Sequence, residues 1–278
     1  MNSVIRHHLK LNQGPVAILW SDDKPDHAAQ FKPGKWGCVM WMLAAAARGK
    51  TAAFDQHTYG CWGGGVGLGF GNQYRAFPGG EACFHHFLST GNERWEQGRA
   101  VVDQMKAGGE SDFLEDFTHG ERYLKSPELV EQFVSDLPII EVPTRYVVLK
   151  PLKQVDPERE QPEVVVFWAD PDALAALVVL ANYARPGNEN VIIPFAAGCQ
   201  SVGIYAYREG RAERPRAVVG QMDLSARLNV SKTMGANAFT FAVPWRLFLE
   251  LEENVADSFV RCPTWQRLRA GAAATPAA

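Results

Sequence analysis

One pattern that occurs twice constrains this chain more than any other feature. An apolar segment ending in tryptophan occurs at residues 15–20 (PVAILW) and again at 163–168 (EVVVFW). Each is followed later by a Gly-Cys pair, ten residues and a glycine, and Cys38 and Cys199 lie 161 residues apart (199 − 38). Short apolar runs are typical of buried strands, and the residues after each cysteine are typical of a helix. We interpret the pattern as two similar sheet-helix halves; a chance match in a glycine-rich chain is the alternative.

Further strand-like and helix-like segments extend this interpretation along the chain. Ser126-Pro127 and Asp170-Pro171 each combine an N-cap residue with proline at the first helical position. Helical spacing predicts a helical insertion in the first half, at about 80–137. Because helices and strands are mixed along the chain, we expect an α+β (or α/β) fold. Additional strands are expected at 146–149, 191–195, 217–222 and 238–243.

These segments suggest a division of the chain into three parts. The length of 278 residues fits about two units of roughly 150 residues each. Residues 1–150 would form a first α+β unit that includes the insertion, and residues 151–262 a second α+β unit packed on the first. Residues 263–278 would form a C-terminal helix remnant and a frayed tail.

Charge and composition exclude several classes of partner. The chain has 28 Lys and Arg against 31 Asp and Glu, so it lacks the basic excess of a nucleic-acid-binding protein. The longest apolar run, residues 36–47, is too short to span a bilayer, and the first residues lack the apolar core of a signal peptide. The five cysteines are an odd number in a chain that needs no disulfides. We expect a cytoplasmic protein with reduced thiols and no nucleic-acid or membrane partner; its oligomeric state, homo-oligomer included, stays open.

Cys38 and Cys199 both stand where a helix is expected to begin. Backbone N–H groups at a helix start stabilise a thiolate and lower the pKa of the thiol. Burial has the opposite effect, because a thiolate loses its hydration, and Trp36 and Trp41 flank Cys38 in the sequence. Two interpretations therefore stay open: a ligating or reactive thiol, and a packed, inert one.

The segment at residues 60–71 (GCWGGGVGLGFG) has seven glycines in twelve positions. Such a composition disfavours a regular helix or strand and is typical of backbone that lets a ligand approach closely. We therefore expect a loop that borders the main pocket and whose amide groups hold a small anionic ligand. The candidate ligand-binding residues are Cys38, Cys61, Gly63, Gly64, Gly65 and Cys199.

Metal binding is an alternative role for the same cysteines. His57 and Cys61 are four residues apart, and together with Cys38 they form a candidate set of metal ligands. No CxxC motif occurs, which removes the strongest signals for zinc, cluster and thioredoxin sites. A metal ion or an iron–sulfur cluster therefore stays a candidate cofactor that no motif assigns.

Other catalytic motifs are incomplete or absent. Gly49-Lys50-Thr51 resembles the end of a P-loop, but alanine stands five residues before Gly49, where that motif needs glycine. The glycine segment does not fit the dinucleotide-binding fingerprint, and the chain has no GxSxG sequence. His85 and His86 lie between two phenylalanines, which favours packing over metal ligation.

The ordered set of segments resembles the DUF169 family over roughly residues 12–250. The resemblance rests on PVAILW, on Cys38 with a helix ending in Ala-Arg-Gly, and on Cys61 before GGGVGLGFG. It continues in VPTRYVVLKPL, EVVVFWADP and AAGCQSVG. The family pattern has cysteines at the positions of Cys38, Cys61 and Cys199, whereas Cys83 and Cys262 have no counterpart. The family has no assigned reaction, so the resemblance implies no mechanism.

Three functions fit these observations. The first is a binding protein with a small-molecule ligand in a cleft lined by the glycine segment and the cysteines. The second is an enzyme that depends on the same cysteines as thiols, as metal ligands or as iron–sulfur ligands. The third is a structural or interaction protein in which the cysteines only pack.

Overall fold

The computed structural model describes residues 1–109 and 111–274, which form two compact units. The first unit comprises Met1–Phe70 and the chain from Ile140 onward, and the second comprises Gly71–Ile139. The helical insertion expected at about 80–137 lies within the second unit. The boundary expected near residue 150 stays a prediction, and residues 275–278 of the expected tail lie outside the described residues.

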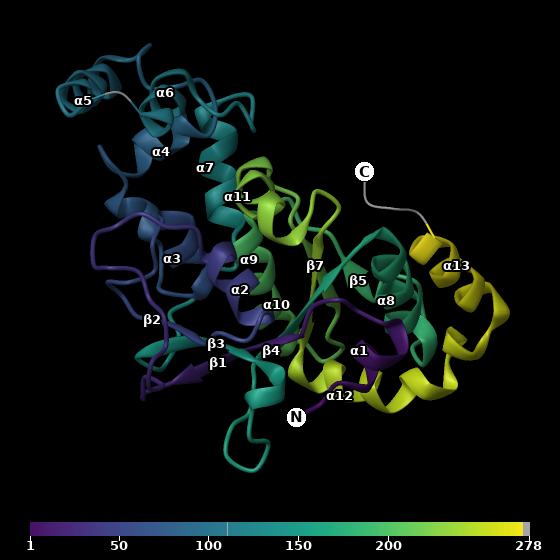
Figure 1. Cartoon of the computed structure of the whole chain (residues 1–278). Coiled ribbons are helices and arrows are strands. Elements are labelled where there is room, and N and C mark those ends of the chain that lie inside the picture. The colour runs from purple at the N-terminus through teal and green to yellow at the C-terminus, as the bar shows by residue number, and fades with distance from the viewer. Residues whose placement is uncertain (110, 275–278) are drawn as a thin grey trace. The chain divides into compact units, whose positions relative to one another are not determined.

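A mixed sheet organises the first unit (Figure 1). Every segment expected as a strand contributes to it, with shifts of a few residues at the ends. The strands are β1 (Val16–Ser21), β2 (Ala52–Phe54), β3 (Tyr146–Pro151), β4 (Val164–Ala169), β5 (Val191–Ile192), β6 (Ala217–Gly220) and β7 (Phe239–Pro244). Their order across the sheet is β2-β3-β1-β4-β7-β6-β5. The predicted α+β class is confirmed.

The strand order is the same in both directions from the centre of the sheet. β1 and β4 pair antiparallel there, with Val16 opposite Val166 and Ile18 opposite Val164. Outward from β1 come β3 and β2, and outward from β4 come β7 and β6, each antiparallel to its inner neighbour. In each half, the strand that comes last in the sequence therefore lies between the other two: β3 lies between β1 and β2, and β7 lies between β4 and β6. The short strand β5 extends only the second half, parallel to β6.

Helices cover both faces of the sheet. Successive residues of a strand point to opposite faces, so both sets of side chains are buried. Ala17 and Leu19 of β1 belong to a core that includes side chains from α1 (Val4–Leu9), α8 (Pro171–Tyr183), α12 (Trp245–Asn254) and α13 (Pro263–Ala274). Trp20 and Ile18 point to the other face, where α2 (Val39–Ala47), α9 (Gly198–Val202) and α10 (Ile204–Gly210) pack. No helix in the described part of the chain is long and apolar enough to cross a membrane.

Two further helices on this second face complete the resemblance between the halves. α3 (Trp62–Leu68) follows β2, and α11 (Leu224–Met234) follows β6. α3 packs against α9, and α11 packs against α2. Each half of the sheet therefore supports a helix that contacts a helix of the other half.

The expectation of an irregular glycine loop is wrong, because α3 is a regular helix made largely of glycine. Its glycines serve close packing: a Cβ on Gly67 would lie 2.6 Å from the carbonyl carbon of Cys199 in α9. A Cβ on Gly203 would overlap the carbonyl oxygen of Gly67. The contact between the two backbones offsets the low helix propensity of glycine, which costs about 1 kcal/mol per residue.

In its described residues, the second unit has four α-helices, a short 3-10 helix (Gln73–Ala76) and the segments that join them. Its core is aromatic: Phe77 packs on Phe84 and Phe117, with ring centroids 5.4 and 5.8 Å apart. Cys83 is buried there, and its carbonyl oxygen accepts a hydrogen bond from Asn92. His86 stacks on Trp95, in agreement with a packing role. The helices are α4 (Glu81–Phe87), α5 (Glu96–Lys106), α6 (Asp112–His119) and α7 (Pro127–Asp136).

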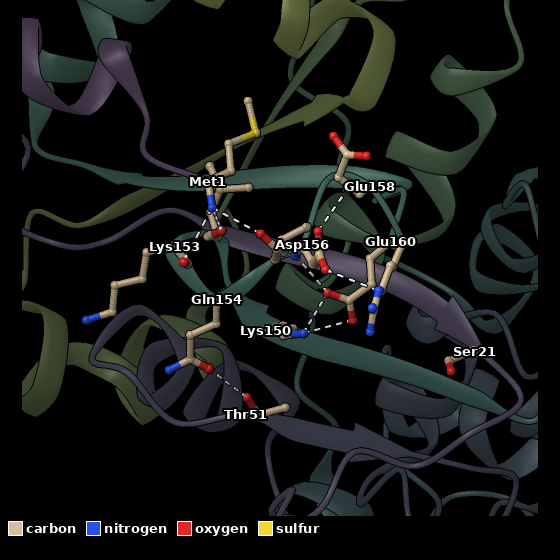
Figure 2. A network of polar contacts seen from close by, with 12 residues as sticks. Met1, Ser21, Thr51, Lys150, Lys153, Gln154, Asp156, Glu158 and Glu160 are labelled. Atoms are coloured by element: carbon tan, nitrogen blue, oxygen red, sulfur yellow. Dashed lines mark hydrogen bonds and ion pairs between the residues drawn. The ribbon is translucent and has the colours of Figure 1, made fainter.

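Polar contacts hold the connection from β3 to β4 in a defined shape (Figure 2). Lys150 donates to both carboxylate oxygens of Glu160, at 2.8 and 2.7 Å. The backbone N–H of Asp156 donates to the same carboxylate, and the amine of Met1 donates to the carbonyl oxygen of Val155 at 3.0 Å. This network fixes the connection between β3 and β4. The cysteines lie on other elements.

A buried ion pair fixes the segment that joins α10 to β6. Glu209 is only 3% exposed and accepts two hydrogen bonds from the Arg216 guanidinium, both at 2.9 Å, and one from Arg208 at 3.0 Å. Burial raises the pKa of Glu209, but the bonds from Arg216 and Arg208 outweigh it, so the pKa lies below its ordinary value of 4.5.

The packing of α3 on α9 predicts a large difference between two glycine substitutions. Gly67→Ala places a methyl group against backbone that cannot move aside, so we expect a loss of about 1–3 kcal/mol in the free energy of unfolding. Gly210→Ala, in α10, meets Pro244 at an ordinary 3.6 Å and should leave stability unchanged or slightly raised. Denaturant unfolding of both variants measures the difference, and equal stability would contradict the packing role.

The Glu209 ion pair predicts a pH-dependent loss of stability. Because the folded pKa lies below the unfolded one, the stabilisation is complete above pH 4.5 and is lost as the pH falls through the folded pKa. Glu209→Gln should lower stability by about 1–3 kcal/mol at pH 7 and flatten this acid dependence. Asp257→Asn, which breaks an exposed pair with Arg261, should cost less than about 1 kcal/mol in the same urea titrations.

Candidate functional site

Backbone contacts bring Cys38 next to Cys61. A Cβ on Gly60 would overlap the carbonyl oxygen of Gly37, so the residues that precede the two cysteines touch. On the other side, a Cβ on Gly64 would lie 2.8 Å from Val39 Cγ2 and 3.4 Å from the sulfur of Cys61. Each cysteine is the N-cap residue of its helix, α2 or α3. The two helix starts therefore lie side by side with their thiols on adjacent backbone.

Cys199 reaches the same place from the second half of the sheet. It lies in the first turn of α9, and its thiol donates to the carbonyl oxygen of Gly63 at 3.1 Å. The backbone N–H of Gly64, the next residue, donates to the sulfur of Cys61 at 3.2 Å. Two adjacent residues of α3 thus bind Cys61 and Cys199, and Cys38 lies next to Cys61 through the contact of Gly37 with Gly60.

Asp223 is a fourth member of this group that the sequence analysis missed. It caps α11, and its Oδ1 accepts from the N–H of Ala226 at 2.6 Å. Its Oδ2 accepts from the N–H of Gly198, the residue before Cys199, at 2.5 Å. The signal was the repeat itself: Asp223 follows Cys61 by 162 residues (223 − 61), one more than the offset between Cys38 and Cys199.

We call Cys38, Cys61, Cys199 and Asp223 the quartet. Their negative charges interact, because ionisation of Cys38 or Asp223 opposes ionisation of Cys61 and of Cys199. Burial is the larger cause: it raises the pKa of Cys61 to about 12, that of Cys199 well above its ordinary value, and that of Asp223. The thiols are therefore protonated at neutral pH.

The environment of Cys38 favours a protonated thiol. Burial raises the pKa of Cys38 more than the backbone N–H groups of Met40 and Trp41 lower it. The flanking tryptophans are themselves partly exposed, Trp36 at 56% and Trp41 at 38%. A helix start alone does not make this thiol reactive in the unliganded protein.

The glycines of α3 do not offer a free cradle to an anion. The N–H of Gly64 donates to the sulfur of Cys61, and the N–H of Gly65 donates to the Cys61 carbonyl oxygen. Gly63 contributes its carbonyl oxygen to Cys199. These residues hold the cysteines in place.

The remaining sulfur and imidazole candidates lie apart from the quartet. His57 is exposed in the turn after β2, where its N–H donates to Asp55. Cys83 belongs to the second unit and Cys262 is exposed near the start of α13. In the described residues, no three His, Cys, Asp or Glu side chains are arranged to hold a single metal ion. A set of Cys38, Cys61 and His57 is therefore not preformed.

Unpaired polar groups lie beside the quartet. Gln221 is fully buried, has φ of +70° and finds no partner for either its Oε1 or its Nε2. Its Oε1 lies 2.5 Å from the position of a Cβ on Gly198. Thr240, one strand away, is also buried with an unpaired hydroxyl. Buried groups of this kind need an explanation, because an unmade hydrogen bond costs about 1–3 kcal/mol.

With the site described, the comparisons with known proteins can be interpreted. A family model described as DUF169, "Uncharacterised ArCR", matches residues 4–254. The chain belongs to the DUF169 family. The match includes all four residues of the quartet and leaves out Cys262. No curated protein and no solved structure matches the chain.

A measurable cavity lies elsewhere in this DUF169 chain. It has a volume of about 340 Å³. Its lining comes from the first residues of the chain, from the segment before β1, from the end of α2 and from the end of β3. Arg6, Arg48 and Lys153 contribute positive charge, but all three are exposed. None of the cysteines lines it. That Cys61 and the α3 glycines border a ligand pocket stays a prediction.

Burial of the quartet predicts a strict order of thiol alkylation. At pH 8 we expect iodoacetamide to modify the exposed Cys262 first, because alkylation needs an accessible thiolate. Cys38 and Cys199 should react only after unfolding, with Cys83 as the buried control in the other unit, and the half-buried Cys61 should react much more slowly than Cys262 because its thiol pKa is raised. Peptide mass spectrometry after timed labelling reads the order. Modification of Cys61 as fast as Cys262 would contradict a pKa near 12.

Proposed function

We propose that this protein binds a soft, thiol-seeking ligand, above all a metal centre, through Cys38, Cys61 and Cys199. The observation that carries the proposal is the convergence of three cysteines from three separate segments on α3. Packing alone explains one buried cysteine well, but not three that share one short helix with an acidic neighbour. Thiolates select soft metal ions and clusters.

The electrostatics of the quartet favour a positively charged occupant. Burial, hydrogen bonds and interactions among the acidic groups are the largest causes of the pKa shifts of its four members, and no lysine or arginine is among these causes. An anionic ligand would add a further negative charge next to Asp223, whereas a cation compensates the thiolates that its binding creates. We therefore favour a metal centre over the small anionic ligand expected from the glycines.

A small organic ligand is the second candidate, and the unpaired amide of Gln221 favours it. An amide offers one acceptor and two donors, which suits the polar end of an uncharged molecule. Both candidates need reduced thiols, and all five cysteines are free in the structure. This supports our proposal of a cytoplasmic protein. The proposal also includes a small-molecule partner and no nucleic-acid partner, and it leaves open whether the protein forms a homo-oligomer.

Cadmium binding tests the proposed function. Reduced protein is titrated with Cd²⁺ without oxygen, and the thiolate-to-metal absorption in the ultraviolet is followed. We expect saturation at one ion per chain, with side chains of the quartet moving onto the ion. Cys38→Ala, Cys61→Ala and Cys199→Ala should each weaken binding by more than the roughly 10–100-fold that outer-shell changes cost.

The chain supplies two matched controls for this titration. Cys83→Ala removes a buried cysteine from the other unit, and Cys262→Ala removes an exposed one. Both should bind Cd²⁺ like the unaltered protein. If the absorption is lost equally with Cys262→Ala, or never develops, the three cysteines do not form a soft-ligand site.

A further inference from the structure

We propose that Asp223 is the fourth ligand of the site and that the occupant is a cubane iron–sulfur cluster held by Cys38, Cys61, Cys199 and Asp223. This inference rests on the proposed function and names its cofactor. It adds a donor that neither the cysteine pattern nor the family match identifies. Three thiolates and one carboxylate would then come from four helix starts, two in each half of the sheet.

Asp223 and Cys61 occupy the same place in the two halves. Cys61 is the N-cap of the helix after β2, and its sulfur accepts from the N–H of Gly64, three residues later. Asp223 is the N-cap of the helix after β6, and its Oδ1 accepts from the N–H of Ala226, also three residues later. Cys38 and Cys199 correspond more loosely, because Cys38 is the N-cap of α2 whereas Cys199 lies in the first turn of α9.

Asp223 also contacts the elements that carry the cysteines. Its Oδ2 binds the N–H of Gly198, next to Cys199, and a Cβ on Gly198 would lie 3.2 Å from Met40 Cγ in the first turn after Cys38. A carboxylate has about four lone-pair sites, and the two backbone bonds use only two of them. Asp223 therefore keeps acceptor capacity for a metal while it caps α11.

The arrangement favours a cluster over a single ion. Contacts between neighbouring residues bring the four donors near one another, yet in the described residues no three of them converge as a single ion requires. A cubane cluster is several ångströms across and takes one ligand at each of four irons, so it suits donors that surround a volume rather than a point. The N–H of Gly64, already bonded to the Cys61 sulfur, is the kind of donor that tunes such clusters.

Gln221 is an independent sign of an occupant. Its amide is held fully buried, with an unfavourable positive φ, two residues before Asp223 and against Gly198. Its unpaired Nε2 is a donor that could reach a cluster sulfide or a ligating sulfur. If packing alone held Gln221 in this state, its unpaired amide and its positive φ would both destabilise the protein.

The binding step is a ligand exchange without net oxidation or reduction. A synthetic [4Fe–4S] cluster carrying four small thiolates meets the reduced protein. Each of the three protein thiols forms an Fe–S bond and gives its proton to the small thiolate that leaves. The ionised Asp223 displaces the fourth ligand through a carboxylate oxygen, and that ligand leaves as a thiolate that takes its proton from the solvent. The cluster core keeps its charge, and the products are the loaded protein, three small thiols and one small thiolate.

The test incubates full-length protein with this synthetic cluster without oxygen and removes the excess by desalting. Iron, sulfide, visible absorption and electron paramagnetic resonance are then measured. We expect one cluster per chain in the unaltered protein. Asp223→Cys should keep the cluster and lower its reduction potential. Asp223→Ser keeps an N-cap oxygen but gives a poor ligand, so mild oxidation should release one iron and produce the resonance of a three-iron cluster.

Asp170→Ser is the matched control. Asp170 caps α8 through the N–H of Ala173 as Asp223 caps α11, and it lies at the start of a helix on the opposite face of the sheet. Its substitution should cost similar stability and leave cluster content and resonance unchanged. Thermal unfolding of both serine variants separates loss of folding from loss of a ligand.

The outcomes separate this inference from the proposed function. If the protein binds Cd²⁺ through the three cysteines but takes up no cluster, or one iron only, the inference is wrong and the proposed function stands. If a cluster binds and the Asp223 variants behave like the unaltered protein, Asp223 is not a ligand. If neither Cd²⁺ nor the cluster binds, both proposals fail.

Discussion

The antiparallel pairing of β1 with β4 is the constraint on which the rest of the first unit depends. It joins two three-stranded halves into one sheet and places β1 and β4 at its centre, away from both edges. Each half then spreads outward in the same order, so helices that follow equivalent strands emerge in related positions. The pairing therefore decides that α2, α3, α9 and α11 meet on one face of the sheet.

The second constraint is the close approach of α3 and α9. Gly67 and Gly203 remove the side chains that would keep the two backbones apart. Because α3 begins at Cys61 and α9 begins next to Cys199, this contact also sets the distance between two thiols. A composition that disfavours a helix in isolation is thus used where backbone contact is worth more than helix propensity.

The chemistry of the quartet follows from burial without a compensating positive charge. Three thiols and a carboxyl group lie near one another, and ionisation of Cys38 or Asp223 makes ionisation of Cys61 and of Cys199 harder. Burial favours the neutral form of such groups, and a bound cation would compensate the charge that ionisation creates. The same physics explains why a helix start does not activate Cys38, since the loss of hydration exceeds the effect of two N–H groups.

The sequence by itself determined the strands, the starts of α2, α7 and α8, the α+β class and the three cysteines, because apolar runs, N-caps and proline act within a few residues. Only the tertiary structure decided that the glycine segment is a helix and that Asp223 and Gln221 belong with the cysteines. His57, near Cys61 in sequence, is turned to solvent instead. The reason is that these outcomes depend on contacts between different elements, 25 residues apart for Gly198 and Asp223 and 136 for Gly63 and Cys199, which local propensity does not determine.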